Sequence, residues 1–121
     1  MDCTFKVHSF LGPGLLESSY EECLFFELVS RGIHAEKQKA MPLVYEGVKL
    51  NIGYRLDLLV ENKVVIEIKA IDALCPIHTS QLLTYLKLSE CRIGFLMNFN
   101  VEKMKDGIKT VSYTHLTLPT N

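Results

Sequence analysis

Hydrophobic residues in the first third of the chain recur at the spacing of an α-helix. Three of them fall on one stripe of such a helix: Tyr20, Leu24 and Leu28. The pattern predicts a helix from about Leu15 to Arg31, with Gly32 ending it. Glu17 extends the stripe by one turn towards the N-terminus, and two interpretations are open. It is either a functional acid held in line with the core, or a first-turn carboxylate favoured by the helix dipole.

The middle of the chain groups its apolar residues as β-strands do. Four runs form two predicted hairpins: Lys39–Tyr45 with Val48–Ile52 around Glu46-Gly47, and Tyr54–Val60 with Val64–Ile68 around Glu61-Asn62-Lys63. Gly53 stands between the two hairpins, where it predicts a bend or a bulge.

The remaining elements alternate between helix and strand. A second helix is predicted from Thr79 or Ser80 to Leu88, with either hydroxyl residue as its cap. The apolar run Arg92–Phe99 predicts a strand that is buried on both faces, and Glu102–Asp106 predicts a short helical turn. This order of elements predicts one domain of the α/β (α+β) class.

Composition and charge limit the class of protein and the cellular location that the sequence allows. The chain has 121 residues, 48% of them hydrophobic and 22% charged, which is ordinary for one globular domain. Its apolar runs are too short to span a bilayer, and its N-terminus lacks the regions of a secretory signal, so we expect a cytoplasmic protein without a membrane partner. Four widely spaced cysteines predict reduced thiols. The net charge of −1 excludes a global basic field but leaves a local basic groove open.

The last eleven residues of the chain are open to two interpretations. Residues 111–121 resemble the translation of a transposon-end sequencing adapter, although a plain amphipathic β-strand is the alternative interpretation. We therefore expect the domain to comprise residues 1–110, followed by a non-native tail at 111–121.

The second hairpin carries the candidate chemistry. If Val60 pairs with Val64, then Asp57 lies directly opposite Glu67, with Cβ atoms about 5 Å apart. Lys69 shares the face of Glu67, because it follows two residues later on the same strand. Two carboxylates facing each other in an apolar hairpin repel and lose hydration unless a cation or a proton joins them. Mg²⁺ fits such a pair, although a simply solvated strand face is the alternative.

These residues resemble a known nuclease pattern. Asp57 followed by Glu67-Ile68-Lys69 is similar to the D…(D/E)-x-K signature of the PD-(D/E)XK nuclease superfamily. Gly14-Leu-Leu-Glu17-Ser-Ser-Tyr20 resembles the motif that names its GxxExxY family, and the likeness extends over most of the chain. The resemblance implies a restriction-endonuclease-like αβββαβ core, with a central mixed sheet flanked by helices and the acids at the edge of the sheet.

The resemblance also implies roles for individual residues. Glu17 would complete a metal shell with the two hairpin acids. Gln81 and Tyr85 match a Q-x-x-x-Y motif found in related nucleases, and at i and i+4 they share one helical face. Gln81 would orient a water or a phosphate, and Tyr85 would touch the substrate or simply pack in the core. Independently of the resemblance, the position of His78 just before this helix suits it either to bind phosphate or to cap the turn, and Arg55 is one of the basic residues that could supply a local basic groove.

The function implied is a Mg²⁺-dependent nuclease that acts on DNA, with RNA less favoured and Mn²⁺ as an alternative ion. Asp57 and Glu67 would hold the ion, and Lys69 would help to position water and stabilise charge on the phosphate. The alternative is a non-catalytic nucleic-acid or protein-binding module that retains the same fold. A homodimer is expected only by analogy with small relatives.

Overall fold

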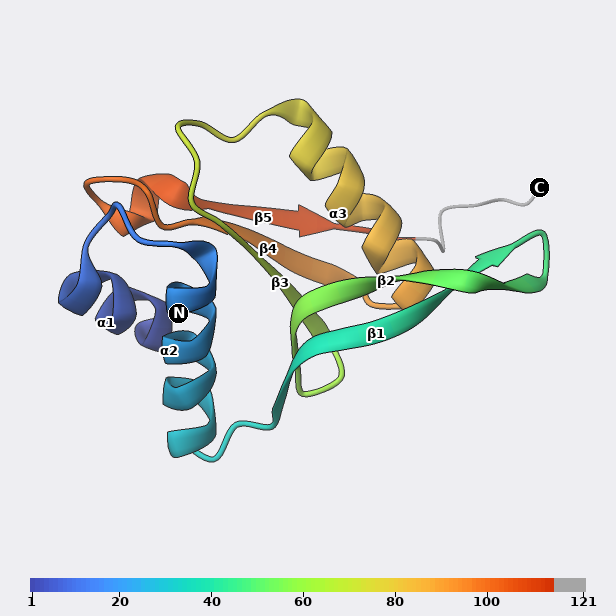
Figure 1. The fold of residues 1–121 in the computed structure, drawn as a ribbon, viewed down its shortest axis with the longest axis horizontal. Helices are drawn as coiled ribbons and strands as arrows, with labels where there is room; N and C mark the ends of the chain where they lie inside the picture. Colours follow the sequence, from blue (N-terminus) through green and yellow to red (C-terminus); the bar gives the residue numbers. More distant parts are fainter. Residues whose placement is uncertain (115–121) are drawn as a thin grey trace.

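A computed structural model describes residues 1–114 as a mixed sheet with helices on both faces. The elements in chain order are α1 (Asp2–Leu11), α2 (Glu17–Ser30), β1 (Ala35–Tyr45), β2 (Val48–Val60), β3 (Val64–Lys69), α3 (Pro76–Ser89), β4 (Ile93–Asn98), the 3-10 helix η1 (Met104–Gly107) and β5 (Ile108–Ser112). The five strands lie in the order β1-β2-β3-β4-β5 (Figure 1). Only β3 and β4 are parallel, and the other neighbours are antiparallel. The predicted α+β class is confirmed.

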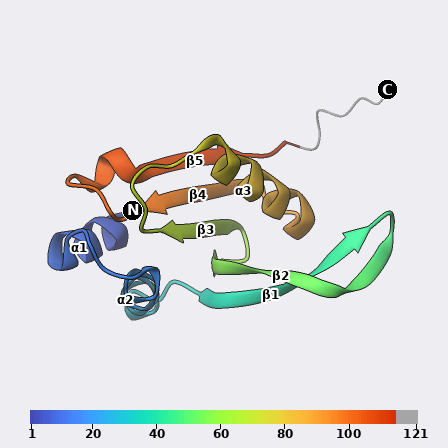
Figure 2. The ribbon, with the colours of Figure 1, turned by 45° about the horizontal axis from the view of Figure 1, so that its top comes forward.

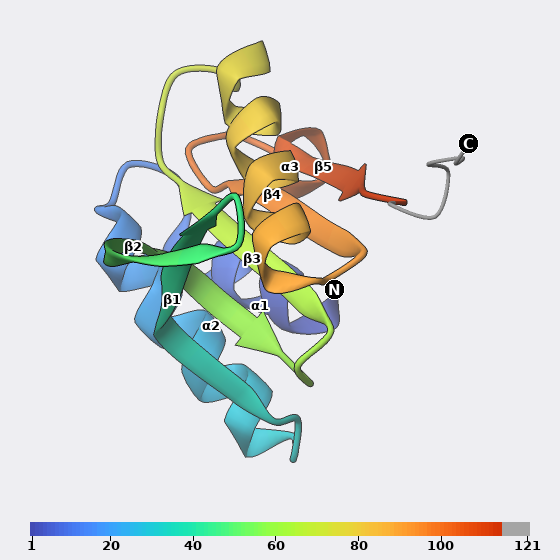
Figure 3. The same cartoon turned by 90° about the vertical axis from the view of Figure 1, so that its right-hand side faces the viewer.

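Two hydrophobic cores lie on opposite faces of this sheet. On one face, residues of α1 and α2 pack against Leu58, Ile66 and Ile68. On the other face, α3 packs against Leu59 and Val65. Figure 3 shows α3 on the near side of the sheet with α1 and α2 behind it. The αβββαβ order runs from α2 to β4, so α1 and β5 are additions at the two ends.

The two N-terminal helices differ in how well the sequence predicts them. The predicted stripe on α2 is buried: Tyr20, Leu24 and Leu28 are at most 7% exposed. Helix α1 was not predicted, because its buried face includes Thr4 and His8 beside Cys3 and Val7. His8 Nε2 lies 2.8 Å from the carbonyl oxygen of Val101, so a polar side chain occupies a core position that a hydrophobic pattern cannot reveal.

Strands β1 and β2 form a long ribbon whose tip extends away from the sheet (Figures 1 and 2). The predicted turn at Glu46 and Gly47 is confirmed, and both residues have positive φ, as a two-residue type I′ turn requires. The two predicted hairpins share one strand, because β2 is continuous from Val48 to Val60. The prediction of two separate strands over this range is therefore wrong.

Gly53 lies where the pairing within the ribbon becomes irregular. It pairs with Pro42, and the register of β1 with β2 shifts between Pro42 and Val44. The irregularity predicted at this glycine is thus present, although the strand continues through it. A Cβ atom at Gly53 would lie 2.4 Å from the carbonyl oxygen of Met41, so this glycine permits a close approach of the two strands.

Strand β3 crosses to β4 through α3, and the start of this helix differs from the prediction. The helix begins at Pro76, not at Thr79 or Ser80, because proline at the first helical position needs no donor of its own. The backbone N–H of Cys75 donates to His78 Nδ1 at 2.9 Å, and this contact caps the helix. No helix in the described part of the chain is long and apolar enough to cross a membrane. The four cysteines are unpaired thiols, as predicted.

The C-terminal strand β5 pairs antiparallel with β4 and was not predicted as a separate element. Val111 lies opposite Gly94 and is 5% exposed. The predicted tail at 111–121 therefore starts inside β5, and its remainder from residue 115 onward lies outside the described residues.

Candidate metal and catalytic site

Strand β2 changes course at Asp57, and this creates the site. The predicted register with β3 is confirmed by the pairs Leu58–Ile66, Leu59–Val65 and Val60–Val64, and the regular pairing stops at Leu58. Residues two apart on a strand normally share a face. Leu56, however, belongs to the core under α3, whereas Leu58 belongs to the core under α1 and α2. At Asp57, therefore, the side chains of β2 change from one face of the sheet to the other, and the strand separates from β3.

Asp57 and Glu67 bridge this separation with reciprocal hydrogen bonds. The backbone N–H of Asp57 donates to Glu67 Oε2 at 3.1 Å, and the backbone N–H of Ile68 donates to Asp57 Oδ2 at 2.8 Å. The two carboxylates thus replace the strand pairing that is lost there. The structure brings together the two acids that the register predicted to face each other.

Two further residues, which the sequence did not single out, complete the polar cluster. Gln38 lies on β1 opposite Asp57, between the pairs Lys37–Leu58 and Lys39–Leu56. Its Nε2 atom donates to Glu21 Oε1 at 2.8 Å and approaches Asp57 Oδ1 at 3.5 Å. Glu21 is 9% exposed, although it belongs to a helix whose other buried residues are apolar or aromatic. The sequence offers one hint: Glu21 lies one helical turn after Glu17.

Glu17, by contrast, is exposed at the start of α2. No hydrogen bond or ion pair among residues 1–114 joins it to Asp57 or Glu67. Four residues of helix span about 6 Å along the axis. Glu21, one turn later, is the α2 acid whose charge acts on Glu67, and the role of Glu17 at the metal site stays a prediction.

Burial dominates the electrostatics of the acids. It raises the pKa of Glu67 to about 8, with the negative charge of Asp57 as the next cause. Burial also raises the pKa of Asp57, against the opposing hydrogen bond from Ile68 and the charge of Lys69. The pKa of Glu21 is raised by burial too, while its hydrogen bond with Gln38 opposes the rise. If all three acids were ionised, the cluster would hold more negative charge than its surroundings compensate, and the raised pKa values express this cost.

Lys69 ends β3 and is half-buried near the pair. Its positive charge lowers the pKa of both Asp57 and Glu67, although burial outweighs this effect. Within the part of the chain that the structure describes, Lys69 forms no ion pair within 4.0 Å. Its ammonium group is close enough to act on the site electrostatically without neutralising it.

The other predicted site residues lie on the α3 side or beside β1. Tyr85 on α3 stacks on Tyr54 with ring centroids 4.7 Å apart, and its pKa is raised by burial and then by the charges of Glu67 and Asp57. Gln81 is exposed one turn earlier on the same helix. Tyr85 is therefore the α3 residue whose electrostatics the acids affect, whereas no hydrogen bond among residues 1–114 joins Gln81 to Asp57 or Glu67.

Arg55 and His78 are placed differently. Arg55 is exposed, and its Nη1 atom donates to the backbone carbonyl oxygen of Gln38 at 3.2 Å, so it touches the strand beside the acids. His78 uses its Nδ1 atom as the cap of α3, as one of the two sequence interpretations proposed.

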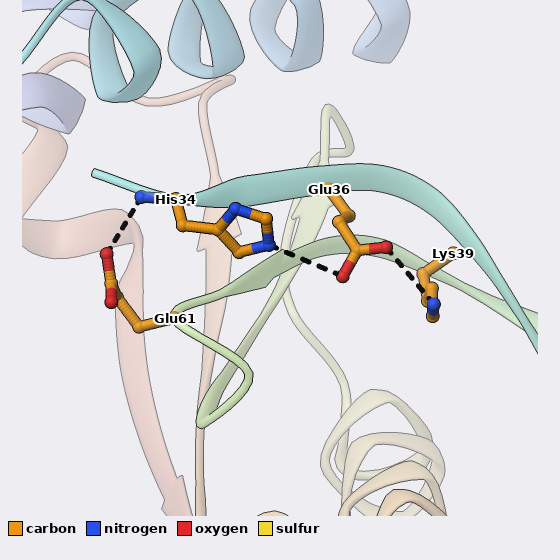
Figure 4. Close-up of polar contacts among 4 residues, drawn as sticks. All are labelled: His34, Glu36, Lys39 and Glu61. Atoms are coloured by element: carbon orange, nitrogen blue, oxygen red, sulfur yellow. Dashed lines mark hydrogen bonds and ion pairs between the residues drawn. The ribbon is translucent and has the colours of Figure 1, made fainter. Parts of the chain in front are cut away.

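A second charged group lies at the start of β1, including the residue before it, and in the turn after β2 (Figure 4). The backbone N–H of His34 donates to Glu61 at 2.8 Å, and Glu36 lies between His34 Nε2 at 3.7 Å and Lys39 Nζ at 3.1 Å. The hydrogen bond from Lys39 lowers the pKa of Glu36. Unlike Asp57 and Glu67, Glu36 lies within 4.0 Å of a lysine ammonium group, so its charge is compensated where that of the Asp57 cluster is not.

A divalent cation suits the donors at Asp57. Among residues 1–114, no three His, Cys, Asp or Glu side chains lie close enough together to ligate one metal ion. Mg²⁺, however, is usually held by only one or two carboxylates and keeps several waters. Asp57 and the buried Glu67 supply hard oxygen donors, and a cation would offset the negative charge that both carry when they are ionised, so the pair fits such an ion.

Comparison with known proteins places this geometry in a family. A profile of the PD-(D/E)XK nuclease superfamily matches residues 1–111. The chain belongs to that superfamily. The superfamily match covers α1, the hairpin acids, α3 and most of β5.

A solved structure titled "Crystal structure of SSO0001" has a similar fold, with a TM-score of 0.62 and 24% sequence identity. The match covers 79% of this chain and 50% of that chain, so this chain spans about half the length of that relative. No curated protein matches the chain.

Proposed function

We propose that the chain is a divalent-metal-dependent nuclease that hydrolyses phosphodiester bonds of DNA. The observation that carries the proposal is the pair of carboxylates on Asp57 and Glu67, each of which accepts a hydrogen bond from the backbone of the other strand at the point where β2 leaves β3. The superfamily assignment supports nuclease activity, and it favours an enzyme over a binding module that merely retains the fold.

Asp57 and Glu67 would hold Mg²⁺, or Mn²⁺ in its place, with Glu21 as the nearest further acid. When bound, the ion supplies Lewis-acid chemistry towards water and the phosphate. Asp57 is suited to ligation because Ile68 holds its Oδ2 atom at 2.8 Å and so fixes the direction of Oδ1. Glu67 is held in the same way by the backbone of Asp57.

Lys69 would place a positive charge where negative charge develops on the phosphate during attack. It is suited to this role because it lies beside the acids and forms no ion pair in residues 1–114. Gln81 and Tyr85 would approach the substrate from α3, and Arg55 would approach it from β2. His78 would reach a phosphate only through Nε2, since Nδ1 caps the helix.

We also propose that the chain belongs to the GxxExxY branch of the superfamily. The structure gives the tyrosine of that motif a physical role. The Tyr20 hydroxyl donates to the carbonyl oxygen of Gly12 at 2.6 Å and accepts from the backbone N–H of Leu15 at 3.1 Å. The ring stacks on Phe99 at 4.5 Å. Tyr20 thereby ties the loop before α2 to the core.

A cleavage screen tests this proposal. Labelled single-stranded, duplex and branched DNA and a matched RNA are incubated with Mg²⁺, Mn²⁺ or EDTA. We expect metal-dependent cleavage of at least one DNA by the wild type and its loss in Asp57→Asn. Glu61→Gln, which removes an acid in the turn after β2, is the matched control and should cleave normally. Binding of DNA without cleavage of any substrate would instead support the binding module.

A further inference from the structure

Gln38 has a backbone conformation that its position does not explain. Five residues other than glycine have positive φ in residues 1–114: Gln38, Glu46, Glu61, Asn62 and Glu90. The last four lie in turns or at a helix end, where this conformation is common. Gln38, with φ of 51°, lies inside strand β1. Non-glycine residues held in this region cost free energy, and they cluster at functional sites.

The unusual conformation changes the direction of one side chain. Successive residues of a regular strand point to opposite faces. Lys37 and Gln38 both reach α2 instead: Lys37 Nζ lies 2.6 Å from Glu22, and Gln38 Nε2 lies 2.8 Å from Glu21. The irregularity therefore turns the amide of Gln38 towards the acids, where a regular strand would point it away.

The contacts of Gln38 connect three elements at the site. Its amide nitrogen contacts Glu21 on α2 and Asp57 on β2, and its backbone carbonyl accepts from Arg55. An amide is neutral, so it can hold two carboxylates in place without competing with a cation for their charge. A lysine in this position would neutralise the acids.

We propose that Gln38 is a positioning residue for the metal site, which holds Glu21 and Asp57 at the spacing that the cation requires. This inference rests on the proposed metal-dependent function. Residues that hydrogen-bond to metal ligands fix ligand direction, and their loss typically lowers metal affinity about 10–100-fold.

Two substitutions distinguish the effect of the side-chain amide of Gln38 from the effect of its backbone strain. Gln38→Gly removes the amide and accepts positive φ without strain. Gln38→Met removes the amide, keeps a similar length and retains the strain. Glu90→Gly is the matched control, because it relaxes a positive φ of 61° at a helix end without touching the site. Circular dichroism and urea denaturation in EDTA establish that each variant is folded.

Calorimetric titration with Mn²⁺ gives the decisive readout. We expect both Gln38 variants to bind Mn²⁺ about 10–100-fold more weakly than the wild type, and Glu90→Gly to bind it equally well. Wild-type affinity in both Gln38 variants would overturn the inference and leave the metal site intact. Weaker binding in only one of the two variants would show that the loss does not follow the amide, and would also overturn it. Absence of Mn²⁺ binding by the wild type would refute the proposed metal site, and this inference with it.

Discussion

Neutralising Glu67 should stabilise the metal-free protein, by an amount that depends on pH. Glu67 is 4% exposed, and burial together with the charge of Asp57 raises its pKa from 4.5 to about 8. A folded-state pKa above the unfolded value means that the folded protein binds the proton more tightly. The stabilising effect of this proton is complete below about pH 4.5 and is lost as the pH rises through 8.

The magnitude follows from the same pKa values. A rise from 4.5 to about 8 sets an upper limit of about 5 kcal/mol, at about 1.4 kcal/mol per pKa unit. The amide introduced by Glu67→Gln would keep an oxygen for the backbone N–H of Asp57 and carry no charge. We therefore expect the variant and the wild type to be similarly stable near pH 5. By about pH 9 the variant should be more stable by a few kcal/mol.

Urea denaturation in EDTA at about pH 5, 7 and 9 measures this difference. Glu36→Gln is the control, because Lys39 lowers the pKa of Glu36 and neutralisation there should not stabilise the protein at high pH. A stability difference between Glu67→Gln and the wild type that does not change with pH would refute the reasoning. A difference that is largest near pH 5 would refute it as well.

Three further predictions concern metal binding, catalysis and the C-terminal strand. Mg²⁺ or Mn²⁺ should raise the melting temperature of the wild type by mass action, and Asp57→Asn should remove most of this rise in a thermal-shift assay; an undiminished rise would place the ion elsewhere. Lys69→Ala should keep metal affinity, measured by calorimetry, but lower the cleavage rate by about two to four orders of magnitude, and equal cleavage would exclude its catalytic role. Deleting residues 111–121 should lower the free energy of unfolding, measured in urea, by about 1.5–3 kcal/mol, because Val111 is buried against β4. An unchanged free energy of unfolding would show that the fold does not depend on Val111.

The hairpin was predictable because its geometry follows from one register. Once Val60 pairs with Val64, the opposition of Asp57 and Glu67 follows from counting along two strands. The buried stripe of α2 was predictable for a similar reason, because helical periodicity fixes which residues share a face. Periodicity does not fix how far along its axis a helix meets the sheet, so the sequence pointed to Glu17 where the structure presents Glu21.

Gln38 was not predictable from local patterns. Its role depends on a positive φ inside a strand and on contacts with residues 17 and 19 positions away in the sequence. The start of α3 was missed for a different reason. The hydroxyl residues Thr79 and Ser80 are favoured caps, but proline is well suited to the first helical position, and the cap comes from Cys75 and His78.

The central claim is that one ion, held by Asp57 and Glu67, supports cleavage of DNA. It is tested most directly by measuring Mg²⁺ binding and DNA cleavage over the same range of Mg²⁺ concentration, in the wild type and in Glu67→Gln. We predict that wild-type cleavage rises with the occupancy of the calorimetric site, and that Glu67→Gln loses both binding and cleavage. Cleavage by the wild type in EDTA, or cleavage by Glu67→Gln at the wild-type rate, would contradict the claim.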